Sequence, residues 1–460
     1  MTGGTAVTPP NILLITADDM EGTTPGAFGG PAGVTPALDR LAAEGMVFRR
    51  AHVAIAVCQP SRSAIMTGQW PHRNGAEGFQ PINDGVPLLT SLLSAAGYSV
   101  GILGKVNHLQ PVERFGWDTV VEMRDLGLGR DPARYADEAA GFLARAEGRP
   151  WFLMVNAHDP HRPFHGSADV AEMFGAAASD IPEPSRVFGA DHAVPPGYLP
   201  DLPAVREEYA QYLSSARRCD DVVGAVLGRL DAAGLTDSTL VVFLSDNGMA
   251  FPFSKANCYL QSTHTPLIVR WPGQVDPGEE ADRFVTMLDL FPTFCEVGGV
   301  EPGDTDGRSL VPLLTGGAPG VERDHIVTVF HETAAKRRYE MRCVQNERYG
   351  YIWNGWADGT TDYRAENMAG LSWSAMLAAA SSDDAVSERV RFYRTRAVEE
   401  LYDLVEDPDS LDNLANRPEY REQLTSMRSL LGRWMADTGD PRRTSFEGAI
   451  GTAVRDGDEP

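Results

Sequence analysis

The chain repeats short, continuously apolar runs that are separated by longer stretches with helical periodicity. Residues 11–16 (NILLIT) form the first run, which is typical of a parallel strand buried on both faces of a sheet. Similar runs lie at residues 98–103, 151–156, 239–244 and 267–270. The intervening stretches predict amphipathic helices at residues 36–44, 88–96, 132–147 and 205–233. Strands that alternate with helices at this spacing indicate an α/β fold, with a large, mostly parallel sheet between helices.

The pattern changes after about residue 328. Strand-like segments at residues 341–345 and 349–354 are followed by an irregular stretch and a terminal helix at residues 418–436. We therefore predict two domains, a large α/β domain at residues 1–330 and a smaller α+β domain with a short antiparallel sheet at residues 331–460. The polar, glycine-rich tail from Asp440 onward is expected to fray.

One long connection stands out from the alternating pattern. Residues 160–203 are rich in proline, histidine, glycine and small residues. Connections of this length are usually functional or disordered. Parallel sheets place their chemistry at the carboxyl ends of the strands, so we expect this segment to pass over the site.

Composition and charge exclude several classes of function. Of the 460 residues, 43% are hydrophobic and 23% are charged, as in soluble globular proteins. The formal net charge of −24 argues against a broad surface for nucleic acid or for an anionic membrane. An anionic substrate would therefore need a local pocket of arginine, lysine and histidine side chains.

Cysteine usage and the N-terminal residues bear on the compartment. The five cysteines form no C-x-x-C pair and have no zinc-like spacing, which suits a reducing compartment. Residues 1–10 have neither the basic region nor the apolar region of a signal peptide, and no run approaches the length of a membrane span. We expect a cytoplasmic protein that binds no membrane.

The segment Cys58-Gln59-Pro60-Ser61-Arg62 carries the most distinctive chemistry. It leads into a short apolar helix that stops at Gly68, and Pro60 suits the first turn of such a helix. The residues after Pro60 are expected to direct free backbone N–H groups and the positive end of the helix dipole at Cys58. Arg62 adds a planar cation. The combination predicts a site for sulfate or phosphate, whereas a cysteine alone is more often a small buried hydrophobic residue.

Two acidic segments follow predicted strands. Asp18 and Asp19 come directly after the first strand, and Asp246 and Asn247 follow the strand at residues 239–244. If the two strands are neighbours, three carboxylates and one amide oxygen meet at one edge of the sheet. Ligands that are all oxygen indicate a hard cation, calcium before magnesium. The alternative for either pair alone is a cap of the following helix.

Basic residues follow the other predicted strands. Lys105 and His108 lie in the segment GKVNH after residues 98–103, and His161 lies in NAHDPHRP after residues 151–156. Lys255 lies nine residues after Asp246. Histidine suits proton transfer because its pKa lies near working pH. The alternative is that these are ordinary surface side chains. Four further side chains either line the pocket or belong to the ordinary surface: His165, His192, His331 and Glu332.

The motif Cys58-x-Pro60-Ser61-Arg62, continued to Thr67-Gly68, resembles the activation signature of the type I sulfatases of the alkaline phosphatase superfamily. The resemblance implies that a formylglycine-generating enzyme oxidises Cys58 to formylglycine, whose hydrate is the nucleophile. It also implies that the cation is Ca²⁺ rather than Mg²⁺. The implied metal ligands are Asp18, Asp19, Asp246 and Asn247.

The same resemblance implies roles for the basic residues. Arg62 polarises the hydrate with the cation, and Lys105 and Lys255 neutralise the sulfate oxygens. His161 (or Lys255) protonates the departing atom, and His108 is the base that lets the aldehyde re-form. The family usually shows Gly-Lys-x-His, whereas this chain has one more residue between lysine and histidine, so Asn107 is an alternative to His108. His158 and Asp159 are expected to orient the turn or line the pocket.

Further segments are similar to the sulfamidase (heparan N-sulfatase) branch, notably HDPHR at residues 158–162, SDNG at residues 245–248 and Met341-Arg342. Lys255 departs from that branch, which carries arginine there. The expected function is hydrolysis of an N- or O-sulfate from a small anionic substrate, a sulfated amino sugar. The alternatives are a phosphonate monoester or phosphodiester hydrolase, or a silent calcium- and glycan-binding protein in which Cys58 stays a thiol.

Overall fold

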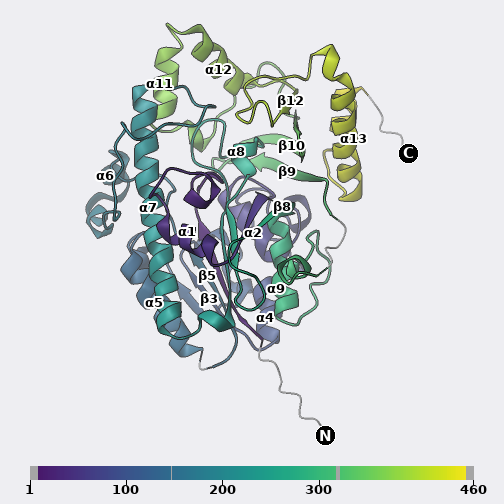
Figure 1. Ribbon diagram of the computed structural model, residues 1–460. Helices are drawn as coiled ribbons and strands as arrows, with labels where there is room; N and C mark the ends of the chain where they lie inside the picture. The colour runs from purple at the N-terminus through teal and green to yellow at the C-terminus, as the bar shows by residue number, and fades with distance from the viewer. Residues whose placement is uncertain (1–8, 147, 318–321, 452–460) are drawn as a thin grey trace.

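The computed structural model describes residues 9–146, 148–317 and 322–451, which form two sheets with helices around them (Figure 1). The large sheet has eight strands in the order β4-β3-β5-β1-β6-β7-β2-β8. In that order the strands are Thr119–Val121, Ser99–Leu103, Trp151–Asn156, Asn11–Ala17, Thr239–Ser245, Leu267–Arg270, Met46–His52 and Glu279–Thr286. All five predicted strands are present, and the prediction of an α/β fold with a mostly parallel sheet is confirmed.

Strand direction was predicted correctly for four of the five runs. β1 pairs in parallel with β5 and with β6, and β5 pairs in parallel with β3. The carboxyl ends of these strands therefore lie side by side. The run at Leu267–Arg270 differs, because β7 is antiparallel to both β6 and β2. A short run that is buried on both faces has the same apolar pattern in either direction, so the sequence does not reveal this reversal.

Helices cover both faces of the large sheet. Leu13 and Ile15 of β1 belong to a core that they share with α1 (Pro36–Ala43), α5 (Pro132–Arg145) and α7 (Pro203–Ala232). Ile12 and Leu14 point the opposite way, into a core formed with α2 (Cys58–Thr67), α4 (Leu89–Ala95) and α9 (Leu290–Val297). Successive side chains of a strand point to opposite faces, so a strand that is apolar throughout contributes to both cores.

The predicted helices agree with the structure to within a few residues. They are α1, α4, α5, α7 and, for the terminal helix, a short turn at Pro418–Tyr420 followed by α13 (Arg421–Asp437). Residue 147, the last of the predicted helix at 132–147, lies outside the described residues. The remaining helices are α3 (Pro71–Asn74), α6 (Asp169–Phe174), α8 (Leu260–Thr263), α10 (Val311–Leu314), α11 (Leu371–Ala379), α12 (Asp384–Thr395) and α14 (Arg443–Ile450).

A smaller antiparallel sheet, in the order β12-β11-β10-β9, lies beside the large one (Figure 1). Its strands are Glu399–Asp403, Tyr349–Asn354, Arg338–Asn346 and His325–Glu332. β9 crosses the boundary predicted at residue 330. The sheet contributes Phe330, Met341 and Ile352 to the core of the α1–α5–α7 side, and its other face packs on α13. The division into domains at residues 1–330 and 331–460 stays a prediction.

Two expectations about the connecting segments were wrong, and a third, for residues 160–203, holds for parts of the segment. The stretch after residue 354 contains α11, α12 and β12. The tail from Asp440 does not fray at its start, because Asp440 is buried against Arg342 and α14 follows it; residues 452–460 lie outside the description. The segment 160–203 meets the site at His161 and then runs along α7, where the Ser185 and Phe188 backbones bond to Asp221 and Ser214. Near its end, Tyr198 donates to Glu21, two residues after Asp19, at 3.0 Å. Contacts so distant in sequence leave no local signal.

No helix among the described residues is long and apolar enough to cross a membrane.

Candidate active site

Polar side chains from two neighbouring strands meet at the carboxyl edge of the large sheet. Asp18 and Asp19 follow β1, and Asp246 and Asn247 follow β6; all four are fully buried. The Asp19 N–H donates to Asp246 Oδ1 at 3.1 Å, and Asn247 Nδ2 donates to Asp19 Oδ1 at 2.7 Å. The structure therefore brings together the four side chains predicted to bind a cation.

Arg62 connects this cluster to two strands of the sheet. It projects from α2, is fully buried, and donates through Nη2 to Asp246 Oδ2 at 2.6 Å. Its Nη1 donates to Thr16 Oγ1 at 2.6 Å and to Asn156 Oδ1. The planar guanidinium, with its five donors in a fixed fork, suits this arrangement, because it reaches the ends of β1, β5 and β6 at once.

Each of the two lysines predicted for the site pairs with a different carboxylate. Lys105 Nζ contacts Asp18 Oδ2, and Lys255 Nζ lies 2.7 Å from Asp19 Oδ1 and 2.9 Å from Oδ2. Burial alone would raise the pKa of Asp18, but Lys105, then His161 and Arg62, hold it well below its usual range. The pKa of Lys255 is raised because Asp19, above all, outweighs the effect of burial.

The carboxylates and the amide fit a hard cation. Asp18 Oδ1 and Asn247 Oδ1 are buried and have no hydrogen-bond partner among the described residues. Asp18, Asp19 and His161 also present ligand atoms within 4.8 Å of one another. The formal charges of the three aspartates are balanced by those of Arg62, Lys105 and Lys255. A divalent ion would therefore make the cluster cationic. Such a local positive charge would attract an anion in spite of the acidic protein around it.

Cys58 begins α2 beside this cluster and is only 4% exposed. Burial raises the pKa of its thiol to about 12, so at neutral pH the unmodified side chain is a neutral thiol and a poor nucleophile. The helix starts at Cys58, so Pro60 lies in its first turn, as expected. The expectation of free N–H groups after Pro60 was wrong for Ser61, whose N–H donates to the Val57 carbonyl oxygen at 3.0 Å. The positive helix end therefore coincides with Cys58.

Two histidines stand at the end of β5. His161 donates from Nδ1 to the Arg162 carbonyl oxygen at 2.6 Å, which leaves Nε2 directed at Asp19, 3.9 Å from its Oδ2. His158 Nδ1 lies 3.9 Å from Asp18 Oδ2. Burial, together with Lys255 for His161 and Lys105 for His158, lowers the pKa of both rings well below the usual range. Both rings are therefore neutral at neutral pH.

The two alternative residues at the end of β3 differ in their burial. His108 is half-buried, and its pKa is lowered by burial and by Lys105, with further effects from Asp18, Arg62 and His161. Asn107 is exposed to solvent. His108 is thus the more buried of the two, and its assignment in place of Asn107 stays a prediction.

Several residues that position the site were not predicted from the sequence. Asn156 accepts hydrogen bonds from Arg62 and Thr16 and donates to the Leu103 and Gly104 carbonyl oxygens, which ties β5 to β3. Arg130 and Arg218 both donate to Asp159, and Arg130 also donates to the His161 carbonyl oxygen at 3.2 Å. Asp159 therefore orients the turn, as expected. Of these residues, only Asn156 was recognisable from the neighbouring sequence, because it is a polar residue at the end of a predicted strand.

The four residues left unassigned lie apart from the aspartate cluster or at its margin. His331 is buried, and its Nδ1 bonds to Glu340 at 2.8 Å. Glu332 accepts a hydrogen bond from Gln80 at 2.8 Å, and the Gln80 carbonyl oxygen accepts one from Gln59 beside Cys58. His165 pairs with Glu183 at 3.2 Å, and His192 is an exposed neighbour of Asp191.

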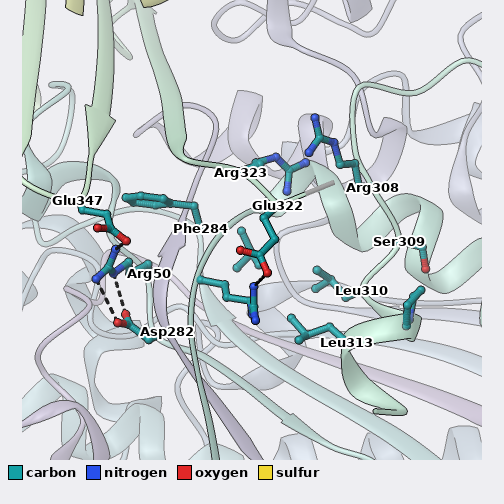
Figure 2. Close-up of a pocket in the computed structure, with 13 residues that line it drawn as sticks. Arg50, Asp282, Phe284, Arg308, Ser309, Leu310, Leu313, Glu322, Arg323 and Glu347 are labelled. Atoms are coloured by element: carbon teal, nitrogen blue, oxygen red, sulfur yellow. Dashed lines mark hydrogen bonds and ion pairs between the residues drawn. The ribbon is translucent and has the colours of Figure 1, made fainter. Parts of the chain in front are cut away.

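A separate pocket lies at β8 and α10, and none of the predicted site residues lines it (Figure 2). Arg50 pairs there with Asp282 at 2.7 Å and with Glu347 at 3.2 Å. Arg323 is occupied by Asp289. Because these arginines already have carboxylate partners, the pocket is a poor match for an anionic substrate.

Two family models match the chain. Residues 10–300 match the model described as Sulfatase, and residues 249–357 match the model described as N-sulphoglucosamine sulphohydrolase, C-terminal. The human N-sulphoglucosamine sulphohydrolase is 32% identical over 96% of this chain and 93% of its own length.

Solved structures share the fold. A structure described as a complex with its substrate D-glucosamine-2-N,6-O-disulfate matches with a TM-score of 0.70 at 20% identity, over 94% of this chain and 99% of its own. The phosphonate monoester hydrolase of Agrobacterium radiobacter matches with a TM-score of 0.66 at 22% identity, over 93% of this chain and 96% of its own. At these identities the likeness concerns the fold alone.

The family implies a metal ion and a formylglycine in general terms, and the oxygen cluster described above agrees with the first of these. With the family model over most of the large sheet and a relative aligned over nearly the whole chain, this protein belongs to the sulfatase family and is a hydrolase of sulfate esters or sulfamates.

Proposed function

We propose that this protein releases sulfate from a small sulfated amino sugar, with Cys58 in its formylglycine form and Ca²⁺ in the carboxylate cluster. The observation that carries the proposal is the position of Cys58, which starts α2 beside Arg62, Lys105, Lys255 and the buried aspartates. The N-sulfate is the first candidate linkage, because the human relative is named an N-sulphoglucosamine sulphohydrolase.

The cation would be held by Asp18, Asp19, Asp246 and Asn247, and it would supply positive charge next to the sulfate oxygens. Ca²⁺ is preferred because the donors are all oxygens and include the two unpartnered oxygens of Asp18 and Asn247. A bound divalent ion would neutralise the aspartates, which now pair with Lys105 and Lys255. Both ammonium groups could then pair with the sulfate.

The formylglycine hydrate supplies the nucleophilic hydroxyl group. Arg62 is held in place by hydrogen bonds to Thr16, Asn156 and Asp246, which fixes its positive charge near the start of α2. Lys105 and Lys255 neutralise the charge that develops on the sulfate oxygens. The neutral ring of His161 holds its proton on Nδ1 against the Arg162 carbonyl oxygen. It can therefore protonate the departing nitrogen or oxygen only after Nε2 has taken up a second proton. An anionic substrate beside the ring raises the pKa of His161 and favours that proton.

His108 is assigned the opposite proton transfer. Burial and Lys105 lower the pKa of its ring, so the neutral imidazole can accept a proton from the second hydroxyl group of the hydrate. A cytoplasmic location and maturation by a formylglycine-generating enzyme belong to the same proposal. They rest on the Cys58-x-Pro60-Ser61-Arg62 motif and on the absence of a signal-peptide pattern in residues 1–10.

The test is sulfate release by protein in which mass analysis of the Cys58 peptide has established formylglycine. Glucosamine N-sulfate, N-acetylglucosamine 6-O-sulfate and an aryl phosphonate are compared in excess Ca²⁺, and Cys58→Ala serves as the inactive control. Preference for the N-sulfate supports a sulfamidase, and preference for the O-sulfate keeps the sulfatase but changes the linkage. Faster turnover of the phosphonate, or activity that persists in Cys58→Ala, would refute the proposal.

A further inference from the structure

A short segment of the chain reaches the site from outside the large sheet. Residues Glu366–Met368 form a single helical turn between β11 and α11. Asn367 Nδ2 donates to the carbonyl oxygen of Lys255, which also accepts a hydrogen bond from Asn257 at 3.0 Å. The turn is therefore attached directly to the lysine assigned to the sulfate group.

Glu366 lies within electrostatic range of the same lysine. Burial alone would lower the pKa of Lys255, but Asp19, then Cys58, Asp18 and Glu366, raise it. The ε-ammonium group itself is taken by Asp19, at 2.7 and 2.9 Å from its two oxygens. Glu366 is therefore a neighbour of Lys255 without being its ion-pair partner.

The turn presents hydrogen-bond acceptors without matching donors. Both carboxylate oxygens of Glu366 and the Oδ1 atom of Asn367 are buried and have no hydrogen-bond partner within the described part of the chain. Buried polar atoms normally have partners, and an unpartnered carboxylate is especially costly. Three such acceptors beside one lysine leave room for donors that the described residues do not supply.

We infer that Glu366 and Asn367 bind hydrogen-bond donors on the leaving group of the substrate, and so select a sulfated sugar with an N–H or hydroxyl groups next to the sulfate. A carboxylate close to an anion site repels a bare anion, so a donor of the substrate has to lie between them. An aryl sulfate has no such donor on its leaving group. This inference rests on the proposed function, because it assumes that the sulfate lies at Lys255.

The experiment measures binding rather than turnover. Dissociation constants for glucosamine N-sulfate and 4-nitrophenyl sulfate are determined by calorimetry in excess Ca²⁺ on full-length Cys58→Ala protein, with and without Glu366→Gln. Because a site built to hydrogen-bond its ligand discriminates strongly against a poorer match, we expect Glu366→Gln to weaken the amino-sugar sulfate about tenfold and the aryl sulfate less than about twofold. Glu388→Gln, on the exposed surface of α12, is the matched control and should change neither constant.

Equal weakening of both ligands would mean that Glu366 acts through Lys255, and would overturn the inference. No change for either ligand, or no binding of either ligand to Cys58→Ala protein, would overturn it as well. Sulfate release by the protein with intact Cys58 is measured separately. If Glu366→Gln selectively weakens binding of the amino-sugar sulfate but the protein with intact Cys58 releases no sulfate, the proposed hydrolysis is refuted. The contact of Glu366 with the sugar is then still supported.

Discussion

At the scale of single residues, the site depends on buried charges that neutralise one another. Asp18, Asp19 and Asp246 are fully buried, and each has a basic partner that comes from a different part of the chain. Removing one partner of such a pair leaves the other as an uncompensated buried charge, which costs more than the pair itself contributes. The cost of losing one partner should therefore depend on whether a bound cation compensates the charge that remains.

We expect Lys255→Met to lower the free energy of unfolding by about 3–5 kcal/mol in the absence of Ca²⁺, because Asp19 then stays buried without a counter-charge. Excess Ca²⁺ should reduce this loss, since a divalent ion can neutralise Asp19 instead. Urea unfolding with chelator and with Ca²⁺ measures both values. Lys336→Met, at an exposed turn, is the control; a loss for Lys255→Met that Ca²⁺ leaves unchanged would contradict the assignment of Asp19 as a metal ligand.

Much of the site was predictable because its residues carry local signals. Asp18 and Asp246 follow an apolar strand directly, Lys105 lies two residues after one, and Cys58 stands at a recognisable helix start. Residues that act through distant contacts gave no such signal. Arg218 lies in the middle of α7, and nothing near it in the sequence indicates that its guanidinium meets Asp159. Glu366 was missed for the same reason, because its surroundings come from other parts of the fold.

At the scale of elements, a carboxylate on β10 connects β9, β10 and the segment before α14. Glu340 accepts hydrogen bonds from His331 at 2.8 Å, Arg338 at 2.9 Å and Arg442 at 2.8 Å. Burial alone would raise the pKa of Glu340, but the hydrogen bond from His331 and the neighbouring arginines hold it well below its usual range. The folded protein therefore favours the ionised carboxylate more than the unfolded chain does.

We expect Glu340→Gln to lower the free energy of unfolding at pH 7 by about 2–3 kcal/mol, because the variant loses charged hydrogen bonds. A carboxyl group whose pKa is depressed on folding contributes its stability above the unfolded pKa, here about 4.5. Below that value the difference from the parent protein should shrink by about 1.4 kcal/mol for each pH unit. Denaturant unfolding from pH 3.5 to 7 measures it, with Glu347→Gln as an exposed control; a difference independent of pH would refute it.

Elements were predictable where burial on both faces made them continuously apolar. β2 and β8 were not predicted, since β2 contains Arg49 and Arg50 and the edge strand β8 exposes Glu279, Glu280 and Asp282. These strands keep their places through pairing with neighbours, because strand propensity depends on context more than helix propensity does. The antiparallel direction of β7 also depends on pairing with its neighbours, so the sequence alone did not predict it.

At the scale of the whole molecule, the two sheets share one core. Phe330, Met341 and Ile352 of the small sheet belong to the same cluster as Leu13 and Ile15 of the large one. The Val329 N–H donates to the Ala54 carbonyl oxygen at 2.8 Å, four residues before Cys58. Neither sheet can lose its packing without exposing apolar surface of the other.

We therefore expect a single cooperative unfolding transition rather than two. Scanning calorimetry and tryptophan fluorescence should give coincident midpoints in the presence of Ca²⁺. Arg342→Met, which leaves Asp440 buried without its partner, should lower that midpoint without splitting the transition. Two separable transitions, or a small sheet that melts while the large one persists, would contradict a shared core.

The burial of Cys58 has a consequence for when the enzyme can be made active. Every residue of α2 is buried, and Cys58 itself is 4% exposed. Under the proposed function, a modifying protein has to reach the peptide around Cys58, which the packed helix does not allow once it has formed. We therefore expect conversion to precede closure of the core, and protein that folds first to keep its thiol and to stay inactive.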